Sequence, residues 1–139
     1  MNEVPSNLKS ILANTSLFGM LNDRQLDEVA LNTTSMRVAR NICVVNQGDM
    51  PKGTFWIVYG QIKIGLCSNQ GSGKTLEILG QNTCFGLGEM LLHRPHLAFM
   101  ETVVESMLLH TECEVMLQMA KENFDFAREL MTCMGRQFY

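Results

Sequence analysis

A chain of 139 residues is long enough for one domain with a full hydrophobic core. Apolar residues make up 46% of it and charged residues 18%, which excludes the composition of a disordered chain. The net charge of −3, with only eleven scattered Lys and Arg residues, argues against nucleic-acid binding by this segment itself.

The sequence has no signal for export or for a membrane. Met1–Pro5 lacks the basic and apolar regions of a signal peptide, and no 18 consecutive residues are apolar. The cysteines lie 17 to 29 residues apart, without a C-x-x-C pair that would indicate zinc or an iron–sulfur cluster: Cys43, Cys67, Cys84, Cys113 and Cys133. We therefore expect a cytoplasmic protein without a metal site, in which Cys43, Cys67 and Cys84 are buried, reduced thiols.

Two short helices are expected near the N-terminus. Leu8, Ile11 and Leu12 have the i, i+3, i+4 spacing of an amphipathic helix over residues 6–13. Asn22, followed by Gln25, is typical of a reciprocal N-terminal cap, which predicts a second helix near residues 23–31.

Short β-prone segments follow, six or seven of them between Ser35 and Thr111. Glycines separate these segments, and glycine enters positive φ without a Cβ clash, so each is predicted to mark a turn: Gly48, Gly60, Gly71 and Gly88. Short strands with frequent turns indicate a β-roll or barrel.

The periodicity becomes helical again after Thr111. One helix is predicted around residues 115–119, and Asn123 should cap a longer helix that runs to the terminus. An apolar stripe lies along that last helix: Phe126, Ala127, Leu130, Met131 and Met134. Two interpretations stay open, since the stripe could pack on the roll of its own chain or form the seam of a homodimer.

One polar segment superficially resembles a phosphate-binding P-loop. Residues 68–75 read Ser-Asn-Gln-Gly-Ser-Gly-Lys-Thr, but Ser68 stands where the G-x-x-x-x-G-K-[ST] pattern needs its first glycine. The segment also joins two predicted strands, whereas a P-loop runs from a strand into a helix. A hairpin turn is therefore the better interpretation.

The order and spacing of these segments, with Phe85-Gly86-Leu87-Gly88-Glu89, resemble the effector-binding domain of the CRP/FNR superfamily of bacterial regulators. The resemblance implies a mainly β fold with flanking helices. Its centre would be a double-stranded β-helix (jelly roll) of the cyclic-nucleotide-binding type, with N-terminal helices and a C-terminal dimerisation helix. Residues 1–120 would form the sensor domain and residues 121–139 the start of the dimerisation helix. The DNA-binding domain of such regulators would be absent from these 139 residues.

The resemblance also implies an effector site, in which Glu89 binds a ribose hydroxyl. The residues it implies for ligand binding are Gly86, Gly88, Glu89, Met90, Arg94, His96 and Leu97. The family's nucleotide binders carry a phosphate-binding Arg after a Pro or Gly, roughly ten residues beyond the glutamate, but here His96 follows Pro95. A charge-assisted hydrogen bond contributes about 1.5–3 kcal/mol, so its loss should weaken cyclic-nucleotide binding by roughly ten- to a hundred-fold unless Arg94 or His96 replaces it.

The expected function is effector sensing in a CRP/FNR-type transcription regulator, transmitted through a dimer helix to a DNA-binding domain. The domain is not expected to be an enzyme. Its expected partners are a small-molecule effector and a second copy of the chain, with DNA contacted only through the missing domain and no membrane contact. The effector is unknown, and cyclic nucleotide and haem are both possible.

Three alternatives stay open. The form Pro-x-x-x-Phe resembles the haem-binding, nitric-oxide-sensing branch of the superfamily, with His93, His96 and His110 as candidate iron ligands. A cyclic-nucleotide-binding module attached to another output, such as a kinase or channel, is the second. A cupin-like metalloenzyme is the third, because cupins share the jelly-roll architecture.

Overall fold

The computed structural model describes residues 7–67 and 73–136. The strands of these residues are β1 (Thr33–Val38), β2 (Cys43–Val45), β3 (Gly53–Tyr59), β4 (Ile62–Cys67), β5 (Gly73–Leu79), β6 (Cys84–Phe85), β7 (Phe99–Thr102) and β8 (Ser106–Glu112). The helical segments are α1 (Leu8–Ala13), the 3₁₀ turn η1 (Phe18–Met20), α2 (Asp23–Leu31), α3 (Leu87–Leu92), α4 (Cys113–Glu122) and α5 (Phe124–Arg136).

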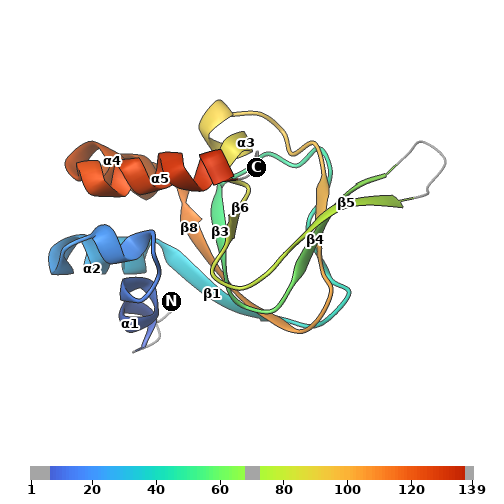
Figure 1. The fold of residues 1–139 in the computed structure, drawn as a ribbon, viewed down its shortest axis with the longest axis horizontal. Coiled ribbons are helices and arrows are strands. Elements are labelled where there is room, and N and C mark those ends of the chain that lie inside the picture. Colours follow the sequence, from blue (N-terminus) through green and yellow to red (C-terminus); the bar gives the residue numbers. More distant parts are fainter. Residues whose placement is uncertain (1–6, 68–72, 137–139) are drawn as a thin grey trace.

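The strands form two four-stranded sheets, which face each other in the roll (Figure 1). The first sheet has the order β1-β8-β3-β6 and the second has the order β2-β7-β4-β5. Every neighbouring pair is antiparallel, and the chain changes sheet between β3 and β4. This jelly roll with flanking helices confirms the predicted fold class.

Glycine makes two of the predicted turns possible. Gly60, between β3 and β4, has φ +108°, and a Cβ there would collide with the side chain of Ser106. Gly48 has φ +95°, while Gly71 lies outside the described residues. The prediction for Gly88 was wrong, because Gly88 lies inside α3 and the turn is made by Gly86 at φ +78°.

The two predicted caps are both present. The Asn22 side chain accepts the backbone N–H of Gln25 at 2.9 Å, and the Gln25 side chain accepts the N–H of Asn22 at 3.0 Å. The Asn123 side chain accepts the N–H of Phe126 at 3.0 Å and so caps α5. Local sequence signals therefore set where both helices begin.

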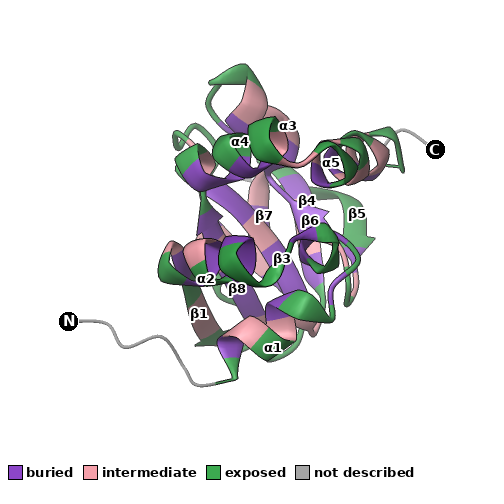
Figure 2. Ribbon diagram, turned by 90° about the vertical axis from the view of Figure 1, so that its left-hand side faces the viewer, coloured by how far each residue is buried: buried purple, intermediate pink, exposed green. Residues whose placement is uncertain are grey.

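The helices cover the outer face of the first sheet and bury a continuous apolar layer against it (Figure 2). At its centre the ring of Phe18 lies 6.4 Å from that of Trp56 and 6.0 Å from that of Phe126. A second, smaller cluster fills the space between the sheets and includes Ile57 and Leu108. The helix-covered layer is thus the larger of the two cores.

The cysteine prediction was only partly right. Cys84 is buried, but Cys43 and Cys67 are exposed. Cys43 lies in the edge strand β2, and Cys67 ends β4 where the β4–β5 hairpin projects beyond the roll (Figure 1). Strand-like sequence alone did not distinguish an edge or a projecting end from the interior.

Candidate functional site

The candidate site is built at the corner between β6 and α3. Gly86 takes the left-handed conformation there, so the chain leaves the strand and enters α3 at Leu87. Leu87 and Met90 point into the helix-covered core and are at most 1% exposed, which anchors the short helix. Glu89 lies on the opposite, half-buried side of α3.

A pocket of about 190 Å³ lies between this corner and the second sheet. Two carboxylates line it, Glu89 from α3 and Glu77 from β5. Gly86 forms part of the wall, and the apolar remainder includes Ile64, Leu79, Ala98 and Met100. The pocket therefore offers hydrogen-bond acceptors to a ligand against an apolar floor.

His96 lies at the edge of this pocket. Its side chain is 4% exposed, and its Nδ1 atom is 3.8 Å from a carboxylate oxygen of Glu89. That separation is too long for a hydrogen bond, and Nδ1 has no partner among the described residues. The backbone of His96 is fixed by the loop after β2, because its N–H donates to the carbonyl of Asp49 and its carbonyl accepts from Gly48, both at 2.8 Å.

The structure separates the remaining predicted ligand-binding residues from the pocket. Arg94 and Leu97 are exposed, Leu97 at 76%, and Met90 is buried in the core instead. Gly88 is half-buried in α3. Of the predicted set, Gly86 and Glu89 line the pocket and His96 is adjacent to it.

Sequence reasoning missed Glu77. It lies 12 residues before Glu89 in the chain and reaches the pocket from the edge strand β5. The available signal was the period of two, because Glu77 and Leu79 share one face of that strand and both line the pocket.

A second pocket, of about 440 Å³, brings together two of the three candidate haem ligands. His96 and His110 both line it, with Asp49, Lys52 and Phe55. Burial lowers the pKa of His110, and the nearby Lys52 adds to that effect, against the opposing Glu112. His93 is exposed at the end of α3. Within residues 7–67 and 73–136, no three His, Cys, Asp or Glu side chains form a metal-binding group of the kind that a cupin-like enzyme needs.

The predicted dimerisation residues lie on two faces of α5. Phe126 and Leu130 are buried in the core of their own chain, at 0% and 5% exposure. Met131 is 59% exposed, while Ala127 and Met134 are half-buried. Phe124, one heptad before Met131, is 73% exposed. The inward face thus packs on the roll, and an outward apolar face remains at the surface.

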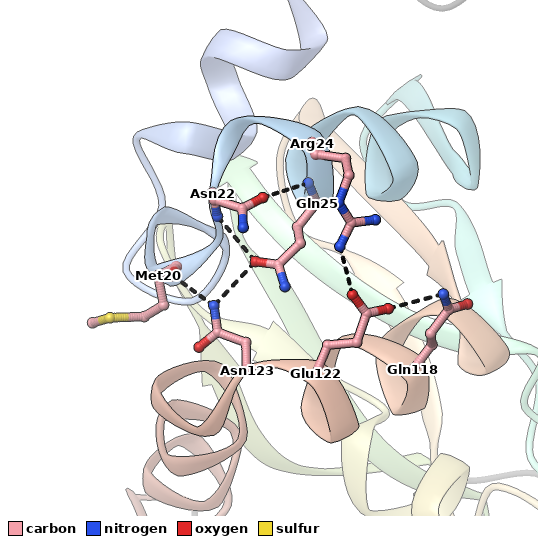
Figure 3. Close-up of polar contacts among 7 residues, drawn as sticks. All are labelled: Met20, Asn22, Arg24, Gln25, Gln118, Glu122 and Asn123. Carbon is pink, nitrogen blue, oxygen red and sulfur yellow. Dashed lines mark hydrogen bonds and ion pairs between the residues drawn. The ribbon is translucent and has the colours of Figure 1, made fainter.

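A polar network fixes the point where α4 gives way to α5 (Figure 3). The Asn123 amide donates to the carbonyl of Met20 at 3.0 Å and to Gln25 at 3.1 Å. Arg24 and Glu122 form an ion pair at 2.7 Å beside it. The N-terminal helices therefore hold the start of α5 in place.

Comparisons with known proteins agree with this architecture. The family model of the cyclic nucleotide-binding domain matches residues 35–123, well over half of the chain. No curated protein matches the sequence significantly. In the described part of the chain, no helix has the length and apolar character needed to cross a bilayer.

Several solved structures share the fold. The sensor domain of the transcriptional regulator DNR from Pseudomonas aeruginosa is 22% identical, with a TM-score of 0.80, over 93% of this chain and 87% of that one. The catabolite activator protein of Thermus thermophilus is 19% identical, with a TM-score of 0.71, over 92% of this chain and 58% of that one. The regulatory domain of Toxoplasma gondii PKA, solved with cAMP, is 20% identical, with a TM-score of 0.67, over 81% of this chain and 42% of that one.

At these identities the structural likeness concerns the fold, which is that of regulatory sensor domains. The family match, the jelly roll and the glycine corner before Glu89 agree with one another. The chain belongs to the cyclic nucleotide-binding domain family, and its structural neighbours include CRP/FNR regulators.

Proposed function

We propose that this chain is the effector-sensing part of a CRP/FNR-type transcription regulator and that its effector binds in the pocket at Glu89. The observation that carries the proposal is the convergence of Glu89, Gly86 and the buried His96 at one pocket beside the second sheet. Glu89 is poised to accept hydrogen bonds from ligand hydroxyls, while the apolar floor contacts a ring. This domain binds and signals and is not an enzyme.

The signal would pass through α5. Strand β6 leads directly into the glycine corner of the pocket, and α5 packs on the core next to that strand. We infer that the outward face of α5, with Phe124 and Met131, pairs with a second copy. A ligand that favours one orientation of α5 then biases the arrangement of DNA-binding domains joined to the helices.

The pocket suggests weak binding of a cyclic nucleotide. His96 follows Pro95, where the family resemblance places the phosphate-binding arginine, and Arg94 is exposed. Two carboxylates, Glu77 and Glu89, already line the pocket, so a phosphate meets repulsion without a fixed positive charge. An effector with hydroxyl groups and little negative charge fits these side chains better.

The test is to restore the missing charge. His96→Arg should increase the affinity for cyclic AMP by roughly ten- to a hundred-fold, because it adds a charge-assisted hydrogen bond. Affinity is measured by calorimetry and by thermal unfolding at increasing ligand concentration. Arg94→Ala is the matched control and should leave the affinity unchanged, while Glu89→Gln in the His96→Arg background should weaken binding. If neither His96→Arg nor Glu89→Gln changes the affinity, the pocket is not the effector site.

Haem is the second candidate effector, and the pocket that joins His96 and His110 favours it. Coordination needs neutral imidazole, the form that the lowered pKa of His110 favours. Haem would supply an iron that binds a diatomic gas, and these histidines would hold it. Titration with hemin separates the candidates: His110→Ala should weaken the change in the haem absorbance spectrum, and the exposed His93→Ala should not. Equal spectra for both variants would contradict a site at His110.

A further inference from the structure

Two cysteines that are distant in the sequence meet where the roll contacts its terminal helix. Cys84 begins β6 and Cys133 lies in the last turns of α5, yet a hydrogen bond joins their side chains. Sulfurs in such contact lie within about 4 Å, so a rotation of the side chains suffices to bring them toward bonding distance. The other three cysteines contribute nothing to this contact.

The pair is accessible to small molecules despite its burial. Cys84 is 3% and Cys133 9% exposed, but both line a pocket of about 240 Å³ that also includes Arg136 and Ser16. Polar groups account for much of the lining, including Asn82 and Thr83. A molecule as small as a hydroperoxide can therefore reach sulfur while larger thiol reagents are hindered.

The two thiols differ in acidity. The hydrogen bond from Cys84 lowers the pKa of Cys133, Arg136 lowers it further, and burial and Glu129 oppose them. The same hydrogen bond and burial raise the pKa of Cys84, which keeps its proton. Cys133 is thus the nucleophilic sulfur of the pair, because the thiolate is the reactive form.

We propose that Cys84 and Cys133 form a hydroperoxide-reactive thiol pair that closes to an intramolecular disulfide between β6 and α5. The Cys133 thiolate attacks one oxygen of hydrogen peroxide, so an S–O bond forms, the O–O bond breaks and hydroxide leaves. Cys84 loses its proton to that hydroxide, giving water, and its sulfur attacks the Cys133 sulfenic acid. The S–S bond forms, the S–O bond breaks and the second water leaves with a proton from the solvent. The thiols are oxidised by two electrons and the peroxide is reduced to water.

This disulfide would fix α5 to the strand that leads into the effector pocket, since Cys84 precedes Gly86 by two residues. Oxidation would then hold α5 in one orientation whatever the pocket contains. The chemistry goes beyond the proposed function and does not depend on it, because it needs only the two sulfurs and an oxidant.

The experiment uses the protein with Cys43, Cys67 and Cys113 changed to Ser, which leaves only the pair. After treatment with hydrogen peroxide, a thiol assay under denaturing conditions should show loss of both thiols, and peptide mapping should show β6 and α5 fragments joined within one chain. The disulfide should raise Tm by roughly 5–10 °C, and a reductant should reverse the change. Wild-type protein mapped in parallel gives the same answer if the triple variant fails to fold.

Single variants test the two assigned roles. Cys84→Ser should accumulate sulfenic acid at Cys133, trapped by dimedone, whereas Cys133→Ser should react at least about ten-fold more slowly, since it lacks the thiolate. Folded protein that yields no joined fragment, or that forms only disulfides between chains, would overturn the proposal. Faster oxidation of Cys84 than of Cys133 would overturn the assignment of the nucleophile.

Discussion

The two sheets of the roll differ in what covers them. The first sheet, β1-β8-β3-β6, is packed against the helices, and Phe18, Trp56 and Phe126 at that contact are at most 3% exposed. The second sheet ends in β5, where every residue from Gly73 to Ile78 is exposed. One side of the roll is therefore built around apolar contacts, and the other leaves a strand largely in solvent.

The difference separates stability from ligand access. Buried apolar contacts contribute most of the free energy of unfolding, so the helix-covered sheet should open last. The pocket draws Glu77 from the exposed strand and Glu89 from the corner beside the core, so it joins a firm wall to a yielding one. A ligand can order the yielding wall without disturbing the core.

The largest effect should come from the helix-covered side. Phe126→Ala removes a fully buried ring from contact with Phe18 and should lower the free energy of unfolding by about 3–5 kcal/mol, measured by urea denaturation. The outward face of the same helix gives the control. Phe124→Glu with Met131→Glu should leave stability at low protein concentration nearly unchanged and give a monomer mass in light scattering. A dimer mass in that variant would contradict the proposed seam.

A smaller effect should come from the junction of the helices. Asn123→Ala removes the cap on the N–H of Phe126 and the bonds to Met20 and Gln25, and should cost about 1–2 kcal/mol (Figure 3). Hydrogen exchange should show faster opening at the start of α5 than in β8. Glu122→Gln, which weakens an exposed ion pair at the same junction, should lose less. Equal losses would mean that the charge, and not the cap, holds the junction.

Much of the fold could be predicted because its signals are local. Asn22 and Gln25 lie within one helical turn of each other, so their spacing alone predicted the start of α2. Gly60 was recognisable in the same way, from one residue type at the end of an apolar strand. Such signals need no knowledge of the rest of the chain.

The candidate site was harder because non-local contacts build it. Whether Arg94 or His96 lies near the pocket depends on the hydrogen bonds that the backbone of His96 makes to Gly48 and Asp49, almost fifty residues earlier. Glu77 reaches the site only because β5 pairs with β4 at the sheet edge. The family resemblance located the corner at Glu89, but it could not show which neighbours the folded loops bring to it.

The smallest effect should come from the exposed strand. Leu76, in β5, is 53% exposed, so Leu76→Thr keeps a β-branched strand former and should change stability by no more than about 0.5 kcal/mol. The measurement is urea denaturation at two protein concentrations. A loss above about 1 kcal/mol that appears only at the higher concentration would mean that β5 packs on a second copy, because only association makes stability depend on concentration. The same loss at both concentrations would mean that the strand is covered within its own chain, and the contrast between the two sheets would then fail.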